Sequence, residues 1–204
     1  MRAFFIAGFV VMVVAQWFVP LSMMRGAHQV IEQGTEYRFK TRPIDPSDPF
    51  RGKYVTLDYE EEMYTPIDTN ELHFETNQEV YALLAPDSAG FMKIIQLSAQ
   101  QPESGIDYIA VKFRYSVPAY NLSGGNGPFD QKGYVNLEFP FKRFYVEESK
   151  ASEAEHLYWS ARRDSSSVCY AKIKAYNGKA TLVDVMIDDR PILDIVREMN
   201  VSED

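Results

Sequence analysis

The chain has 204 residues, a formal net charge of −8 at pH 7 and a hydrophobic fraction of 46%. This length and composition fit a folded protein with one domain or two small ones. The acidic excess argues against nucleic acid, and against an anionic membrane surface, as the partner of the folded part. The single cysteine, Cys169, excludes an internal disulfide, so packing must stabilise the fold.

The N-terminal stretch Phe4–Met24 contains no charged residue and lies between Arg2 and Arg25. Since a helix rises about 1.5 Å per residue, this stretch would cross a hydrocarbon core of roughly 30 Å. We predict a membrane anchor over residues 1–33, placed in the lipid bilayer through Phe4–Met24 and ended by Gly34. A cleaved signal peptide is the alternative, but its apolar region normally spans only about 7–15 residues.

The remainder of the chain is rich in strand patterns, and an aromatic share of 14% favours β structure. The dipeptide Asn177-Gly178 is a strong hairpin signal. We expect strands at Tyr37–Arg42, Gly52–Tyr59, Glu79–Ala85, Phe91–Leu97, Tyr108–Val117, Tyr134–Val146 with a break at Pro140, Val168–Tyr176 and Ala180–Ile187.

Helices are expected at three places in this part of the chain. A short one is placed near Asn70–Phe74, a second after the capping box Ser152–Glu155, and a third after Pro191. The second would bury one face formed by Ala154, Leu157, Tyr158 and Ala161. The fold class is therefore α+β, mostly β, with an N-terminal transmembrane helix followed by a β-rich domain.

The two halves of the chain resemble one another. The run Tyr54–Tyr59 matches Tyr134–Phe139 at an offset of 80 residues, and weaker matches pair Phe39 with Phe113 and Tyr81 with Tyr170. The order of these segments is the same in both halves, which predicts an internal duplication. We expect two β-rich lobes, 34–102 and 103–204, the second with one capped helix. The alternative is that amphipathic strands resemble each other by composition.

A Pro- and Asp-rich loop precedes the first of these matching runs. Three prolines fix φ at their positions and disfavour helix before them, which predicts a rigid corner. From Tyr54 onward the pattern has period two, so Val55, Leu57 and Tyr59 should share one face of a strand.

The run Gly52-Lys53-Tyr54-Val55-Thr56-Leu57-Asp58-Tyr59 resembles the signature of the GDYXXLXY family of bacterial membrane-anchored proteins. The glycine, both tyrosines and the leucine match, whereas Lys53 stands in place of the family's aspartate. The resemblance implies an extracytoplasmic domain anchored in the bacterial inner (cytoplasmic) membrane, with multi-span membrane proteins as candidate partners. It implies no established activity, and Lys53 argues against a catalytic or metal-binding role for that motif position.

No residue pattern predicts a catalytic residue, a metal site or a cofactor. The three histidines His28, His73 and His156 share no metal-ligand spacing. We therefore predict binding or assembly rather than catalysis. The candidate binding residues at the corner are Arg51, Lys53, Tyr54 and Tyr59, and the two tyrosines are also expected to be structural.

One enzyme reading is kept as the alternative, a membrane-bound peptidase with a Ser–Lys pair. Ser22 follows Pro20 near the end of the apolar stretch, and Lys93 or Lys112 could act as the base from a predicted strand. Such a lysine must be desolvated beside the serine to accept a proton near neutral pH.

Overall fold

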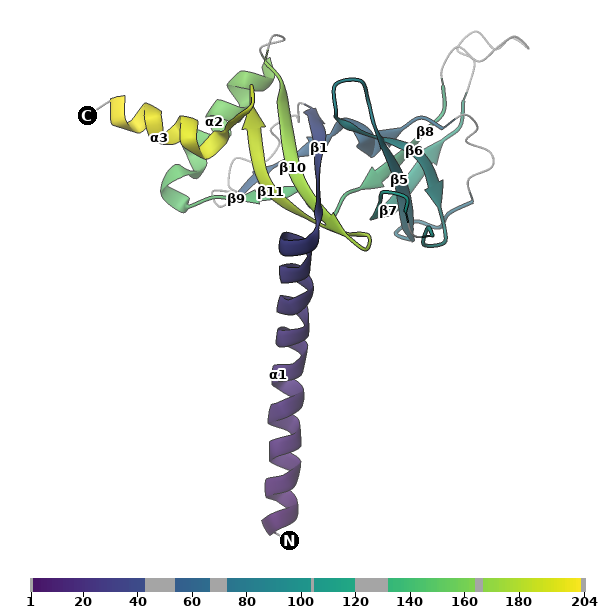
Figure 1. Ribbon diagram of the computed structural model, residues 1–204, viewed down its shortest axis with the longest axis vertical. Coiled ribbons are helices and arrows are strands. Elements are labelled where there is room, and N and C mark those ends of the chain that lie inside the picture. Colours follow the sequence, from purple (N-terminus) through teal and green to yellow (C-terminus); the bar gives the residue numbers. More distant parts are fainter. Residues whose placement is uncertain are drawn as a thin grey trace.

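The molecule consists of one long helix that stands below a β-rich domain (Figure 1). This computed structural model describes residues 2–42, 54–66, 73–103, 105–119, 132–163 and 167–202. Helix α1 spans Arg2–Gln33 and continues through Pro20. Gly34 alone separates it from strand β1, Thr35–Arg42. The predicted helix and its end at Gly34 are confirmed.

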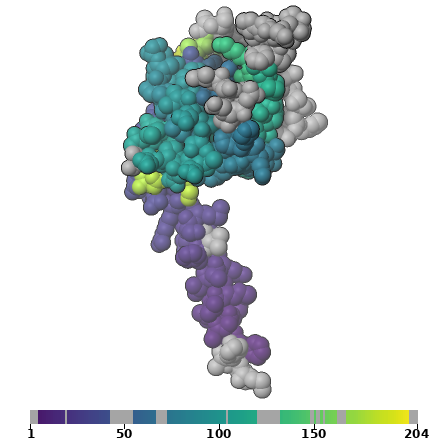
Figure 2. Space-filling view, turned by 90° about the vertical axis from the view of Figure 1, so that its right-hand side faces the viewer, coloured from purple at the N-terminus to yellow at the C-terminus, as the bar shows by residue number. Residues whose placement is uncertain are grey.

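Helix α1 is long and apolar enough to cross a membrane, with a mean hydropathy of 2.0 over its most apolar part. In the space-filling view it projects from the domain as a separate stalk (Figure 2). Large apolar side chains are exposed along its length, among them Phe5, Ile6, Phe9, Val10, Val11, Trp17, Phe18, Met23 and Met24. A helix that is apolar on all sides and uncovered by protein is suited to lipid.

The strands and helices of the domain fall close to the expected segments. The strands are β2 Tyr54–Thr56, β3 Asp58–Tyr59, β4 Met63–Tyr64, β5 Glu79–Pro86, β6 Met92–Ser98, β7 Tyr108–Val117, β8 Tyr134–Glu138, β9 Arg143–Tyr145, β10 Cys169–Tyr176, β11 Lys179–Ile187 and β12 Arg190–Pro191. The helices are the 3₁₀ turn η1 Glu60–Glu62, α2 Glu148–Arg163 and α3 Ile192–Ser202. The mainly β fold class is thus confirmed.

Helix α2 differs from its prediction at one end. It begins at Glu148, so Ser152 lies inside the helix rather than at its N-terminus. Serine is tolerated inside helices at a small energetic cost, so a capping-box pattern is not restricted to helix starts. The predicted inner face is nevertheless correct, because Ala154 and Tyr158 are fully buried. The expected helix near Asn70–Phe74 lies mostly outside the described residues, and Phe74 itself is not helical.

Two five-stranded sheets and one two-stranded sheet are formed by the described residues of the domain. The first sheet has the order β12-β11-β10-β1-β3, and the second has the order β6-β5-β7-β8-β4. Strands β2 and β9 pair with each other, and β2 is separated from β3 only by Leu57. Helices α2 and α3 pack together beside the first sheet (Figure 1).

The predicted boundary at residue 102 does not separate these sheets. Strands β10 and β11 come from the second half of the chain, yet they extend the sheet that contains β1. Likewise β5 and β6 from the first half extend the sheet that contains β7. Each half therefore contributes a hairpin that pairs with a strand of the other half, β10–β11 with β1 and β5–β6 with β7.

Strand pairings recur at the offset of the sequence match. Thr56 pairs with Arg143 where β2 meets β9, and Asn136 pairs with Met63 where β8 meets β4. Each residue in one pair lies 80 positions from its counterpart in the other, which is the offset of the sequence match.

The hairpins repeat as well. Both β10 and β5 carry an irregularity at matching positions, between Lys172 and Ile173 in one and between Leu83 and Leu84 in the other. These matched registers support the internal duplication, which stays a prediction.

The register also corrects one of the weaker sequence matches. Phe39 of β1 pairs with Ala171, and Ile109 of β7 pairs with Ala82. The structural counterpart of Phe39 is therefore Ile109 and not Phe113. Alternating apolar strands permit such four-residue slips because their pattern repeats every two residues.

Candidate functional site

The family-like motif lies where the two sheets approach each other. Its residues Val55, Leu57 and Tyr59 are buried, as the period-two pattern predicts. The strand is interrupted at Leu57, whose N–H donates to the carbonyl oxygen of Lys142 at 2.8 Å. Upstream of this break the motif pairs with β9, and downstream it pairs with β1. The motif therefore joins two strand pairs, and its apolar residues serve the core.

Tyr59 is fully buried and belongs to an aromatic cluster. Its hydroxyl donates to the carbonyl oxygen of Phe141 at 2.9 Å, and its ring lies 5.3 Å from that of Phe139 and 5.2 Å from that of Phe141. Burial raises the pKa of Tyr59 well above the ordinary tyrosine value, and the nearby Tyr158 and Glu62 add to the shift. Tyr59 is thus a neutral core residue at the junction of the sheets.

Of the other three predicted binding residues, the structure describes only Tyr54. Tyr54 is the first residue of β2 and pairs with Tyr145 of β9. Arg51 and Lys53 lie outside the described residues. The structure therefore brings Tyr54 and Tyr59 into one strand region, and the recognition role of the four residues stays a prediction.

A charged cluster that sequence reasoning missed lies next to the motif. Glu62 is only 1% exposed, and its Oε1 lies 2.9 Å from Nζ of Lys142. Lys142 Nζ also lies 3.8 Å from Oδ1 of Asp58, and Arg42 Nη2 lies 3.6 Å from Oδ2 of the same aspartate. Burial raises the pKa of Glu62, while Lys142 offsets part of this shift.

The partners in this cluster come from separate parts of the chain, so no local motif indicates the cluster. One signal was available in the sequence, because Glu62 and Lys142 are separated by the same 80 residues as the repeated run. Positions related by a two-fold arrangement meet at its axis, as in symmetric dimers.

The structure also places the cysteine and an acidic turn. Among the described residues, no group of three or more His, Cys, Asp and Glu side chains could hold a metal ion. Cys169 is buried at 2% exposure in β10, consistent with a small core residue. Asp188 and Asp189 form a turn with positive φ, in which Asp189 accepts a hydrogen bond from Tyr170 at 2.7 Å.

The candidate peptidase residues lie on different parts of the molecule. Ser22 is on the exposed stalk α1, whereas Lys93 is on β6 of the second sheet. Burial alone would lower the pKa of Lys93, but hydrogen bonds and charges from Glu61 and Glu60 outweigh it, so the pKa is raised. A lysine base needs a lowered pKa, and Lys93 therefore suits an ion pair better than proton abstraction.

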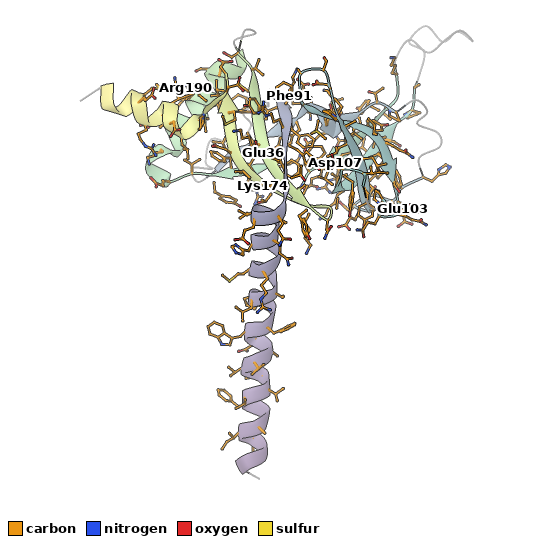
Figure 3. All side chains as sticks on the ribbon, viewed as in Figure 1. Glu36, Phe91, Glu103, Asp107, Lys174 and Arg190 are labelled. Atoms are coloured by element: carbon orange, nitrogen blue, oxygen red, sulfur yellow. The ribbon has the colours of Figure 1, made fainter. Side chains whose placement is uncertain are left out.

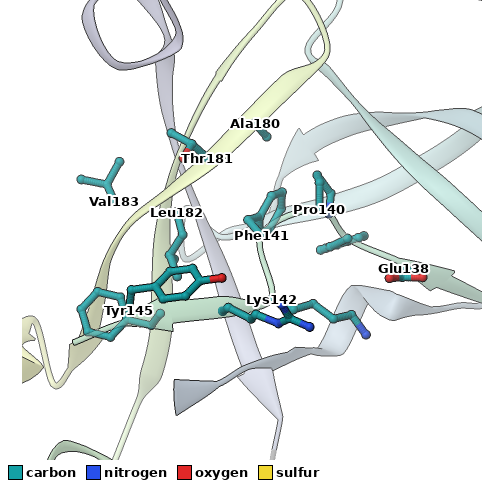
Figure 4. Close-up of a pocket in the computed structure, with 12 residues that line it drawn as sticks. Glu138, Pro140, Phe141, Lys142, Tyr145, Ala180, Thr181, Leu182 and Val183 are labelled. Carbon is teal, nitrogen blue, oxygen red and sulfur yellow. The ribbon is translucent and has the colours of Figure 1, made fainter. Parts of the chain in front are cut away.

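A cavity of about 550 Å³ with both polar and apolar walls lies beside the motif. Figure 4 shows Thr181, Leu182 and Val183 of β11 on one side and Phe141, Lys142 and Tyr145 on the other. Phe144, which pairs with Val55 of the motif, also lines it. We call this space the β9–β11 groove.

A second cavity of about 340 Å³ lies at the base of the domain, between the sheets. Tyr37 of β1 donates from its hydroxyl to Oδ1 of Asp107 at 2.5 Å, and both residues line the cavity. Burial, followed by Asp107, raises the pKa of Tyr37. The side-chain view places Asp107 next to the second sheet, just before β7, and Lys174 beside the end of α1 (Figure 3).

Together these features define a β-rich protein carried on an N-terminal helix that can cross a membrane. A family model described as GDYXXLXY protein matches residues 16–185. The chain therefore belongs to the GDYXXLXY family, as its motif indicated. Comparisons with curated proteins and with solved structures returned no match.

Proposed function

We propose that the protein is a single-pass, membrane-anchored binding or assembly protein of the bacterial inner membrane, with its β-rich domain on the extracytoplasmic side. Multi-span membrane proteins are the proposed partners. The observation that supports this most directly is the continuity of α1, a helix with exposed apolar side chains, with the first strand of the domain.

The junction between helix and domain is tight. Val30 is buried, and the N–H of Gly34 donates to its carbonyl oxygen at 3.0 Å. A side chain at Gly34 would clash with that same oxygen. Lys174 of β10 donates from Nζ to the carbonyl oxygen of Ile31 at 2.6 Å, near the end of the helix where cations are favourable. The domain is therefore held in a defined direction relative to its anchor.

This geometry also sets the height of the domain above the bilayer. From Met24 to Gly34 the helix rises about 15 Å beyond the apolar run. The domain would then start just above the headgroups, within reach of the short loops of a membrane partner. A rigid module at that height suits stable assembly with a neighbour.

Orientation can be tested with an accessible cysteine. Gln96 is exposed on β6, and the native Cys169 is buried. In a Cys169→Ala background, Gln96→Cys should react with a membrane-impermeant maleimide in cells with a permeabilised outer membrane. Labelling only after lysis of the inner membrane would overturn the proposed orientation, and release of soluble protein would overturn the anchor.

The binding role is tested by mild detergent extraction and affinity purification of the full chain. A stoichiometric multi-span protein in the eluate is the expected result. A monomer without partners that hydrolyses peptides, and loses this activity in Ser22→Ala, would instead establish the peptidase alternative.

A further inference from the structure

The edges of β6 and β11 occupy equivalent positions in the two sheets, but they differ in how their backbone groups are covered. Strand β6 is the edge of the second sheet, and β11 is open along most of its length because β12 pairs only with Met186 and Ile187. An unpaired strand edge presents backbone N–H and C=O groups that can pair with another chain. The matched registers allow the two edges to be compared residue by residue.

In the second sheet this edge is covered by side chains. The N–H of Ile94 donates to Oε2 of Glu61 at 2.8 Å, and the hydroxyl of Tyr64 donates to the carbonyl oxygen of Ile95 at 3.0 Å. Lys93 secures Glu61 through an ion pair of 2.7 Å. We call Ile94–Ile95 the closed edge.

In the first sheet the equivalent edge lacks this cover. Leu84 pairs with Ile94 and Ile173 pairs with Leu182, so Leu182 and Val183 are the counterparts of Ile94 and Ile95. We call Leu182–Val183 the open edge. No side chain in the described part of the chain is hydrogen-bonded to its backbone groups.

The first sheet has different residues at the positions equivalent to those that cover the closed edge. At the 80-residue offset, Glu61 corresponds to Phe141 and Tyr64 corresponds to Phe144. A phenylalanine ring has no group that can bond to a backbone N–H or C=O. Both rings instead line the β9–β11 groove together with the open edge, where about 550 Å³ is unfilled (Figure 4).

We infer that the β9–β11 groove binds an extended segment of a partner protein, which adds as a strand to the open edge. An extended backbone supplies both the acceptor and the donor that Glu61 and Tyr64 supply at the closed edge. Leu182 and Val183 offer apolar surface to side chains of the segment, over the buried Phe141 and Phe144. This inference rests on the proposed binding function and names the mode of binding.

Position narrows the partner. Lys142 in the groove wall is already paired with Glu62 and Asp58, so the segment would be recognised through its backbone and its apolar side chains rather than through charge. Strand β11 also contacts α1, so the groove lies near the membrane end of the domain. A loop of a membrane-embedded partner could therefore reach it.

The test uses Val183 and its counterpart Ile95, which are 45% and 56% exposed. A photo-crosslinking amino acid is placed at either position in the full chain in its native membrane, and crosslinked peptides are identified by mass spectrometry. Crosslinks from position 183 to a loop or tail of a membrane protein, without the same crosslinks from position 95, are expected. Val183→Lys should reduce the co-purified partner at least tenfold, whereas Ile95→Lys should leave it unchanged.

Each result that contradicts the inference leads to a different conclusion. If a partner co-purifies with the wild type but position 183 crosslinks to nothing or only to lipid, the groove inference fails and the proposed function stands. Crosslinks to a second copy of the chain would overturn the inference in favour of edge-to-edge pairing. If no protein co-purifies with the wild type and none is crosslinked, the proposed function fails with it.

Discussion

Glu62 and Lys142, 80 residues apart in the chain, form an ion pair of 2.9 Å beside the family motif. The same offset relates Tyr59 to Phe139, whose rings lie 5.3 Å apart. Positions separated by the offset of the sequence match thus contact each other, as the predicted duplication would lead us to expect.

The first prediction concerns the buried pair. Lys142→Met should lower the free energy of unfolding by about 3 kcal/mol at neutral pH, because it leaves the buried Glu62 without its ion-pair partner. Chemical denaturation of the full chain in detergent, followed by circular dichroism, measures this. Lys150→Met is the control, since Lys150 pairs with the largely exposed Glu147 and should matter little. Equal losses in both variants would contradict the argument.

The second prediction concerns pH. The pKa of Glu62 is raised in the folded protein, so its protonated form favours folding. That contribution is present below the ordinary glutamate range and is lost as pH rises from there through the raised pKa. Glu62→Gln should remove this loss, so that the variant gains stability relative to the wild type as pH rises above the ordinary glutamate range of about 4.

The variant Glu147→Gln should show the opposite pH dependence of stability. The Lys150 hydrogen bond lowers the pKa of Glu147, so the wild type should gain stability relative to this variant as pH rises through the carboxyl range. Unfolding curves at several pH values check both slopes. Parallel pH profiles for Glu62→Gln and the wild type would show that Glu62 is not perturbed by folding.

The third prediction concerns the hairpin between β10 and β11. Gly178 has φ +78°, and a Cβ there would lie 2.8 Å from Cε2 of Tyr108 on the other sheet. Gly90, in the hairpin between β5 and β6, has φ +82° and nothing within 4 Å of its Cβ position. Gly90→Ala should lower the free energy of unfolding by about 1–2 kcal/mol from φ strain alone. Gly178→Ala should lower it further because the added Cβ clashes with the Tyr108 ring.

A double variant separates the two causes. Removing the ring with Tyr108→Ala should make the further effect of Gly178→Ala resemble that of Gly90→Ala, as measured by thermal unfolding. If Gly178→Ala is no more damaging than Gly90→Ala in the presence of Tyr108, the close approach of the hairpin to the second sheet is wrong.

The fourth prediction separates the structural and binding roles of the motif. Tyr59→Phe should lower stability by about 1 kcal/mol through the lost hydrogen bond to Phe141, and Tyr59→Ala by about 3–5 kcal/mol through the cavity. The half-exposed Tyr115 serves as control in Tyr115→Phe, which should change little. A Tyr59→Phe variant that loses a partner while keeping wild-type stability would assign Tyr59 to recognition.

Local patterns in the sequence were sufficient for most of the secondary structure. The apolar run of α1, the period-two strands and the turn at Asn177-Gly178 each depend on neighbours a few residues apart. They appear close to where they are expected, except that the strand predicted to end at Tyr59 is interrupted at Leu57. The burial of Val55, Leu57 and Tyr59 also followed from alternation alone. The start of α2 did not follow from the local pattern, because serine is compatible with both a helix start and a helix interior.

Only the tertiary structure decided which strands pair and which distant residues meet. Both hairpins carry the same alternating pattern, so nothing local specifies that β10 joins β1 while β5 joins β7. The same is true of the Glu62–Lys142 pair and of the open edge at Val183, since each depends on which side chain of one half meets the backbone or side chain of the other. Strand alternation specifies which face is buried, whereas the choice of neighbour is made by packing between segments distant in the chain.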